Sequence, residues 1–189
     1  MRKRCSVYLL LSLAAAGCAR QAYDTYTNRD EVLKFSWQVP HGWRARAYHH
    51  PDYEAAGVTF FPARQEKEPY HAFFAVWAAQ LPHQLRGGAE TLRDAARRSL
   101  TKAMRLPNAR LLDRGGRMID TETAAEAVIA YTGSTDISRP DAPAAPVKER
   151  FLILLCDDRV VTIRYVNREA DFDHYEAAFL HGLETLRFH

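Results

Sequence analysis

The chain has 189 residues, with 26 lysines and arginines against 23 aspartates and glutamates and a formal net charge of +3. The excess comes from Arg2, Lys3 and Arg4 at the start, and the rest of the chain carries 23 residues of each sign. A neutral chain gives no electrostatic argument for nucleic acid or an acidic lipid surface as partner. Its length favours one domain that buries a sizeable core.

Residues 1–17 have the pattern of a secretory signal peptide. The basic start is followed by a tract from Val7 to Ala16 that is apolar apart from Ser12. This tract is too short to span a bilayer, which takes about 20 apolar residues. An ordinary cleaved signal peptide is therefore one interpretation, in which the cysteine that follows it is incidental.

The residues Ala15-Ala16-Gly17-Cys18 resemble the lipobox of bacterial lipoproteins. The resemblance implies cleavage before Cys18, a diacylglycerol on its thiol, and a further acyl chain such as palmitate on its amine. Two or three chains give stable anchoring where one is marginal. Because Ala19 follows in place of an acidic residue, the resemblance also implies the outer membrane of a Gram-negative bacterium, with the protein facing the periplasm.

Cysteine usage leaves no intramolecular disulfide. Cys5 is lost with the signal peptide, Cys18 is used for lipid attachment, and Cys156 remains alone. Cys156 ends an apolar run and no neighbouring residue supplies a base, so we expect a buried, inert thiol and not a redox or catalytic one.

Residues 18–31 are polar and without a period, which predicts a tether, and residues 32–189 are predicted to form a single domain. The alternation of Phe35, Trp37 and Val39 indicates a half-buried strand. Trp43 follows a turn at Pro40 to Gly42 and is expected to anchor the core, with ligand stacking as the alternative. Strands are expected at 33–40, 44–48, 56–62, 71–81, 109–113, 123–133, 149–156 and 160–166.

Apolar residues recur at helical spacing over 89–104 and again at Phe172, Tyr175, Phe179 and Leu183, which predicts two helices. Asp157 and Asp158 are predicted to join the last two strands as a hairpin. The segment 134–147 contains three prolines and is predicted to be a long loop. Such a loop either presents itself to a partner or is a tolerated insertion.

Short motifs at both ends of the domain resemble the PsbP-like and DcrB-like group over residues 33–188. They are Val39-Pro40 and Gly42-Trp43 at the start, and the segments 171–175 and 183–188 at the end. The resemblance implies an α+β fold, an α-β-α sandwich with a central, mostly antiparallel sheet; another relative of this fold is a small Ran-binding nuclear-import factor. Members are accessory subunits, assembly factors, adaptors and lipoproteins, and are rarely enzymes.

The sequence lacks the motifs of common enzymes. It contains no Gly-x-Ser-x-Gly nucleophile motif, no phosphate-binding glycine loop and no His-Glu-x-x-His zinc motif. We therefore predict that the protein is not an enzyme and needs no cofactor. Arg86 and Gly87-Gly88 either bind an anion or simply form the turn into the helix.

The candidate metal ligands are His49, His50 and Asp52, with Glu54 nearby. Imidazole and carboxylate suit zinc or a similar ion. Neighbouring residues of an extended chain point to opposite sides, however, so a solvated turn is the favoured interpretation. His174 and His181 are two helical turns apart, about 10 Å, which is too far to share an ion.

The most concentrated charge lies at Arg93, Arg97, Arg98 and Lys102, within the first predicted helix. These residues either form a solvated outer face or dock to an acidic protein or lipid head groups. We expect a membrane-anchored bacterial lipoprotein that is a non-enzymatic binding, accessory or assembly module for another envelope protein. The alternative is a periplasmic lipoprotein that binds a small ligand or metal at residues 49–54 or beside Trp43.

Overall fold

The computed structural model describes residues 21–50, 55–65, 72–80, 92–134 and 143–189. Within them the chain forms ten strands and two α-helices. In chain order these are β1 Tyr23–Arg29, β2 Lys34–Pro40, β3 Trp43–His50, β4 Ala55–Pro62, β5 Phe73–Gln80, α1 Leu92–Ala103, β6 Arg110–Ile119, β7 Glu122–Gly133, β8 Ala145–Cys156, β9 Arg159–Arg168, α2 Asp173–Thr185 and β10 Arg187–Phe188.

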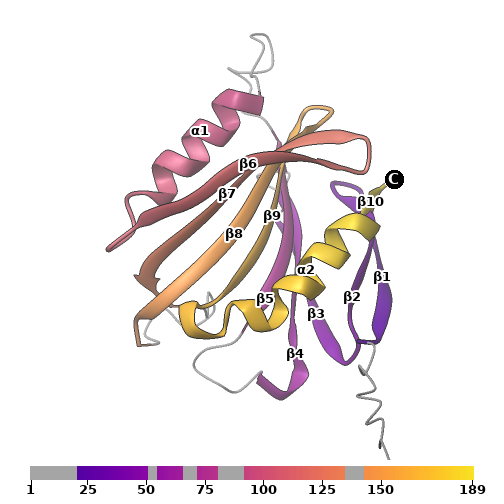
Figure 1. Cartoon of the computed structure of the whole chain (residues 1–189). Coiled ribbons are helices and arrows are strands. Elements are labelled where there is room, and N and C mark those ends of the chain that lie inside the picture. Colours follow the sequence, from indigo (N-terminus) through magenta and orange to yellow (C-terminus); the bar gives the residue numbers. More distant parts are fainter. Residues whose placement is uncertain (1–20, 51–54, 66–71, 81–91, 135–142) are drawn as a thin grey trace, which may run out of the picture.

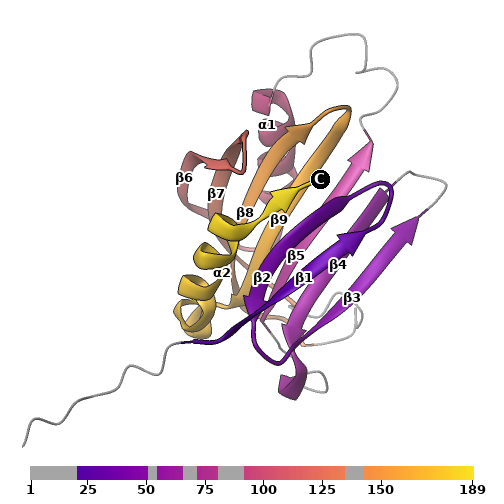
Figure 2. The ribbon, with the colours of Figure 1, turned by 90° about the vertical axis from the view of Figure 1, so that its right-hand side faces the viewer.

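Seven strands form one antiparallel sheet in the order β3-β4-β5-β9-β8-β7-β6, and β1, β2 and β10 form a smaller antiparallel sheet. Helix α1 covers one face of the large sheet at β7 and β8, whereas α2 and the small sheet cover the other face (Figures 1 and 2). Each face has its own buried apolar cluster. The predicted α-β-α sandwich with a central antiparallel sheet is confirmed.

Aromatic side chains fill the core beneath α2. Phe179 is fully buried and contacts the rings of Trp37, Phe74 and Tyr165. The Tyr165 hydroxyl donates a hydrogen bond to the carbonyl of Phe172, which fixes the chain where it enters the helix. The predicted apolar stripe of the closing helix is therefore confirmed.

The hairpin predicted at Asp157-Asp158 is also confirmed, because Cys156 pairs with Arg159 across it. Asp157 has a φ of 54°, the left-handed conformation that aspartate tolerates in tight turns.

The predicted tether at 18–31 is wrong over half of its length. Residues Tyr23 to Arg29 form β1, which pairs with β2 along its whole length. The Asn28 side chain donates to the Leu33 carbonyl at 2.6 Å, and Tyr26 packs edge-on against Phe60. A strand at the edge of a sheet is held by its backbone pairing, so it needs no alternating apolar pattern.

The predicted loop at 134–147 is too long at its C-terminal end. Ala145 and Val147 already belong to β8, where they pair with Gly133 and Tyr131, and Val147 is fully buried. Residues 135–142 lie outside the described residues, as do Gly87, Gly88 and the first turn of the predicted helix.

Strand β6 is longer than the predicted strand over 109–113 and extends to Ile119, which is buried. Glycines at 115 and 116 interrupt its alternation of apolar and polar residues, and a bulge lies between Leu111 and Asp113.

Candidate functional site

Helix α1 contacts the sheet mainly through small side chains. Among its residues only Ala95 is fully buried, and Leu92, Leu100 and Ala103 are half-buried against the cluster on that face. Alanines recur along the contacting face of the helix, and their short side chains leave space on both sides of it. Phe151 of β8 lines the grooves on both sides of α1.

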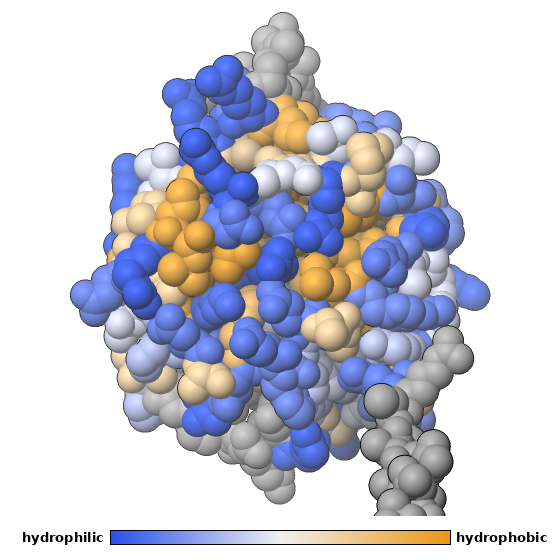
Figure 3. All heavy atoms as spheres, viewed as in Figure 1, coloured by the Kyte–Doolittle hydropathy of each residue, from blue (hydrophilic) through white to orange (hydrophobic). Residues whose placement is uncertain are grey.

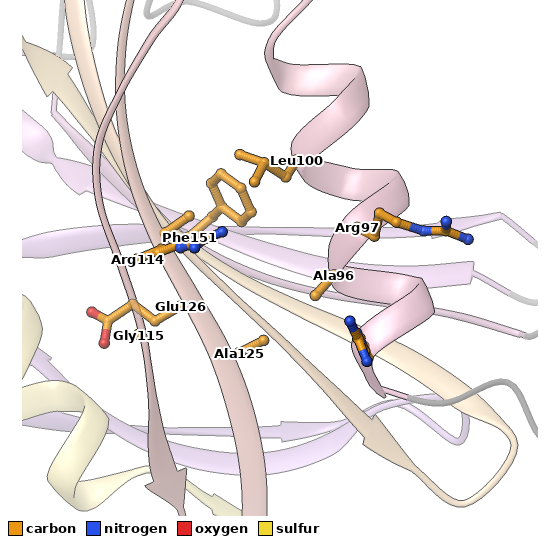
Figure 4. Close-up of a pocket in the computed structure, with 10 residues that line it drawn as sticks. Ala96, Arg97, Leu100, Arg114, Gly115, Ala125, Glu126 and Phe151 are labelled. Carbon is orange, nitrogen blue, oxygen red and sulfur yellow. The ribbon is translucent and has the colours of Figure 1, made fainter.

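The larger of these two grooves lies between α1 and β6 and has a volume of about 520 Å³ (Figure 4). We call it the arginine-rimmed groove, because Arg93 and Arg97 of α1 and Arg114 of β6 stand along its edges. Its apolar lining consists of Ala96, Leu100, Gly115, Ala125, Ala127 and Phe151. In Figure 4 the Phe151 ring lies toward Leu100, whereas Arg97 extends away from the sheet.

The rim of this groove is positively charged. Glu126 is the single carboxylate among the described residues that line it, and its oxygens accept hydrogen bonds from Arg117, at 2.8 and 3.0 Å, and from Arg150. Arg97 has a weak contact with Asp94 at 3.4 Å. Neither Arg93 nor Arg114 forms an ion pair with any described residue. The groove therefore suits an anionic group attached to an apolar body.

The smaller groove, about 280 Å³, lies on the other side of α1 and contains a buried ion pair. The Glu149 carboxylate is 4% exposed and accepts hydrogen bonds from Arg164 at 2.6 and 2.9 Å. The Tyr131 hydroxyl donates to the same carboxylate at 3.3 Å, and burial raises the pKa of Tyr131. A buried carboxylate that accepts three hydrogen bonds is satisfied by its partners and has a structural role here.

Large apolar side chains are exposed next to the arginine-rimmed groove. Figure 3 shows apolar atoms gathered over the region where α1 ends and β6 begins in Figure 1. The exposed residues of this part of the chain are Met104 at 39%, Leu106 at 39%, Leu111 at 39%, Leu112 at 45% and, farther along β6, Met118 at 60%. Large apolar side chains that are exposed in one region of a protein are typical of interaction sites.

The four basic residues predicted as a partner face do not lie on one side of α1. Arg93 and Arg97 line the arginine-rimmed groove, Lys102 lines the smaller groove, and Arg98 is exposed. Their role in binding stays a prediction. The sequence reasoning missed Arg114, because the strand was predicted to end at Asp113; the apolar residues Met118 and Ile119, beyond the two glycines, were the available signal that the strand continues.

Trp43 is half-buried and packs on Phe74 and Tyr175 with ring centroids 4.4 and 5.1 Å apart. It also lines a depression of about 610 Å³ together with His41, Arg64 and the start of the described chain at Gln21. The Trp43 side chain thus both packs on the core and borders a concave surface.

The candidate metal ligands are only partly described. His49 and His50 are consecutive in β3 and so face opposite sides of the sheet, and His49 contacts Asp30 at 2.9 Å. Asp52 and Glu54 lie outside the described residues. Among residues 21–50, 55–65, 72–80, 92–134 and 143–189, no three His, Cys, Asp or Glu side chains gather as a metal site.

The Cys156 thiol is half-buried, and burial raises its pKa to about 11, with nearby carboxylates adding to the effect. Cys18 lies outside the described residues. In the part of the chain that the structure describes, no helix is long and apolar enough to cross a bilayer.

The fold is shared with solved structures of low sequence identity. LpqN of Mycobacterium tuberculosis, which is involved in cell envelope biogenesis, matches with a TM-score of 0.57 and 9% identity, over 89% of this chain and 91% of LpqN. Cyanobacterial PsbP (CyanoP) of Synechocystis sp. PCC 6803 matches with a TM-score of 0.56 and 12% identity, over 93% and 98%. The Ran-binding protein Mog1p of Saccharomyces cerevisiae matches with a TM-score of 0.53 and 10% identity, over 88% and 95%.

No protein-family model and no curated protein sequence matches this chain. At identities of 9 to 12% the structural likeness shows the fold alone, which is that of PsbP-like proteins.

Proposed function

We propose that this protein is a bacterial lipoprotein, anchored to the outer membrane through Cys18, that binds another envelope protein and catalyses no reaction. The lipobox-like residues before Cys18 support the anchor. The fold shared with LpqN, a protein involved in cell envelope biogenesis, supports an accessory role in the envelope.

The observation that carries the proposal is the arginine-rimmed groove beside the exposed apolar residues of β6. Its apolar floor suits the side chains of a bound protein segment, and its three arginines suit carboxylates on the same segment. We therefore expect the docking segment of the partner to be acidic with interspersed apolar residues.

The proposal is tested by site-specific photocrosslinking in cells. A photoreactive residue at Ala96, inside the groove, is expected to capture one envelope protein that the same residue at Thr27 on β1 does not capture. Reversing the rim charge with Arg93→Glu and Arg97→Glu is expected to lower that capture about tenfold, because the variant loses two attractive charges and gains two repulsive ones.

The matched control reverses two exposed charges elsewhere. Arg29→Glu and Lys34→Glu make the same charge change on β1 and β2 and are expected to leave the capture unchanged. Equal capture by the two charge-reversed proteins would show that the groove does not bind the partner.

A second candidate function is the binding of a small ligand at the depression beside Trp43. The specific observation is that a half-exposed indole, the Arg64 guanidinium and the Tyr175 hydroxyl meet there, with Arg64 and Tyr175 hydrogen-bonded at 3.2 Å. A ligand at this site is expected to raise the Tm of the protein and to lose that effect in Trp43→Ala, whereas Arg93→Glu leaves it intact.

A further inference from the structure

Strand β6 is the last strand of the large sheet, and no described strand pairs with its outer edge. Nine of its ten residues are exposed or half-exposed. An unpaired edge of this length is a template for another strand unless the chain protects it. Strand β6 carries charges and one bulge, but it also exposes Leu112 and Met118, which a protected edge avoids.

The fold itself does not require glycine at position 115. A Cβ built on Gly115 meets no atom within 4 Å, and its φ lies outside the left-handed region. Glycine inside a strand weakens it unless a bulge or the close approach of another backbone requires the small residue. The bulge of β6 lies elsewhere, between Leu111 and Asp113. Because strand side chains stand above and below the sheet, a side chain at position 115 would not block a strand at the outer edge.

The sequence of β6 is complementary to itself in one antiparallel register. When Gly115 lies opposite Gly115 of a second copy, Asp113 lies opposite Arg117 and Leu112 opposite Met118. Opposite charges and apolar pairs at directly opposed positions stabilise antiparallel strands. Each of these contacts occurs twice, because a two-fold axis relates the copies.

Neighbouring registers lack this match. Centring the pair on Arg114 places two guanidinium groups opposite each other and Leu111 opposite Arg117. Centring it on Gly116 places Asp113 opposite Ile119 and Arg114 opposite Met118. These two registers differ from the first by two residues. A slip by one residue instead turns one copy over, so that its side chains face the opposite side of the sheet.

We propose that two copies of this protein pair through β6 in the register centred on Gly115, so that their large sheets become one continuous sheet. The partner is thus a second copy of this chain, and it contributes half of the surface that forms around the paired β6 strands. In this register both α1 helices stand on the same face of the joined sheet. The reason is that directly opposed residues of an antiparallel pair have their side chains on the same face.

The dimer joins the two arginine-rimmed grooves into one cleft. Its floor runs from β7 through both β6 strands to the second β7, a span of about 14 Å at the usual strand spacing, and the two α1 helices form its walls. Arg114 of each copy then lies near the seam.

The test uses cysteine crosslinks in the full chain, in detergent, on a Cys156→Ala background. Gly115→Cys places two thiols opposite each other, at a Cα separation of about 5 Å that a disulfide spans, so oxidation is expected to give a covalent dimer rapidly. The parent without an added cysteine sets the background, and Glu184→Cys, exposed on α2, measures random collision.

The register is tested by a mixture. Leu112→Cys and Met118→Cys, mixed, are expected to form a mixed dimer, whereas each alone forms little, because identical positions lie about 20 Å apart in this register. Dimers of Leu112→Cys alone in excess over the mixed species overturn the register. Crosslinking of Gly115→Cys and of the mixture no faster than that of Glu184→Cys overturns the dimer.

Thermal unfolding of each reduced variant checks that it is folded. If Gly115→Cys is unstable, the mixture of Leu112→Cys and Met118→Cys decides whether the dimer forms.

The dimer goes beyond the proposed docking function, and the experiments can refute either proposal without the other. Arg93→Glu with Arg97→Glu lowers the capture of an envelope protein but leaves β6 and its crosslinks intact, whereas loss of the crosslinks leaves capture by a single groove possible.

Discussion

At the scale of single residues, burial and pairing limit the reactivity of Glu149 and Cys156. The Glu149 carboxylate is buried and paired with Arg164. The Cys156 thiol is neutral because burial disfavours its thiolate and the carboxylates of Glu122, Asp157 and Asp120 add to that effect. Neither group has the combination of reactivity and access that a catalytic residue needs.

Cys156 is expected to react slowly with iodoacetamide in the folded protein. At pH 8 the shift of its pKa from 9.0 to about 11 lowers the thiolate fraction about 100-fold relative to the unfolded chain. Mass spectrometry of the peptide that contains Cys156 measures the alkylation rate in native buffer and in urea. Equal rates in the two conditions would show that the thiol is not shielded.

The same shift makes stability depend on pH. Because the folded state keeps the thiol proton longer than the unfolded chain, the contribution of Cys156 is fully present below pH 9 and is lost as the pH rises toward about 11. Cys156→Ser removes this contribution, so the difference in unfolding free energy between the two proteins is expected to shrink over that range.

At the scale of elements, the contact between α2 and the small sheet depends on a glycine in α2. Gly182 of α2 lies against Trp37 of β2, and a Cβ there would overlap the indole and stand 3.1 Å from the Gln38 carbonyl oxygen. The Thr185 hydroxyl, one turn further along α2, accepts a hydrogen bond from the Gln38 amide at 3.2 Å. The helix therefore packs at a distance that only glycine permits.

Gly182→Ala is expected to destabilise the protein by about 1–3 kcal/mol, because overpacking against a fully buried indole outweighs the gain in helix propensity. Chemical denaturation measures the change. Gly115→Ala in β6 is the matched control and is expected to be neutral or slightly stabilising, since a Cβ there meets nothing within 4 Å. A stabilised Gly182→Ala would mean that α2 lies farther from β2.

At the scale of the whole molecule, β1 changes how far the domain reaches from its proposed anchor. Because β1 begins at Tyr23, only residues 19–22 separate it from Cys18, and four residues span at most about 14 Å. Tyr23 pairs with Pro40, next to the turn that leads to Trp43. An anchor at Cys18 thus holds the Trp43 end of the domain near the membrane surface.

Cys18→Ala is expected to abolish palmitate labelling, leave the unprocessed form and remove the protein from the outer-membrane fraction. The reason is that the proposed lipid attachment depends on the thiol of this residue. Labelling and fractionation measure these changes, with Cys156→Ala as the control that keeps the lipid. Unchanged labelling and outer-membrane attachment of Cys18→Ala would refute the lipoprotein proposal.

Much of the fold was predictable because its signals are local. Strands such as β2 and β9 alternate or are continuously apolar, and the stripe from Phe172 to Leu183 recurs at helical spacing. The strand β1 was missed because its polar residues pair with β2 through the backbone, which leaves no apolar period. The end of β6 was missed because Gly115 and Gly116 interrupt the alternation of apolar and polar residues that indicates a strand.

The candidate site was predictable only in part. Arg93 and Arg97 were identified as concentrated charge, yet their neighbour Arg114 belongs to a strand that is distant from α1 along the chain. The sequence does not show that α1 rests on the sheet through small side chains. The groove follows from that contact and from the position of β6 beside it.

The amino-acid sequence by itself determined the α+β class, most of the strands, the closing helix and the lipobox-like start, because each depends on residues close together in the chain. Only the tertiary structure decided that β1 completes a second sheet, that β6 is an unpaired edge and that three arginines surround an apolar groove. These features depend on which strands become neighbours, and strand order is set by packing between distant segments, which no local pattern encodes.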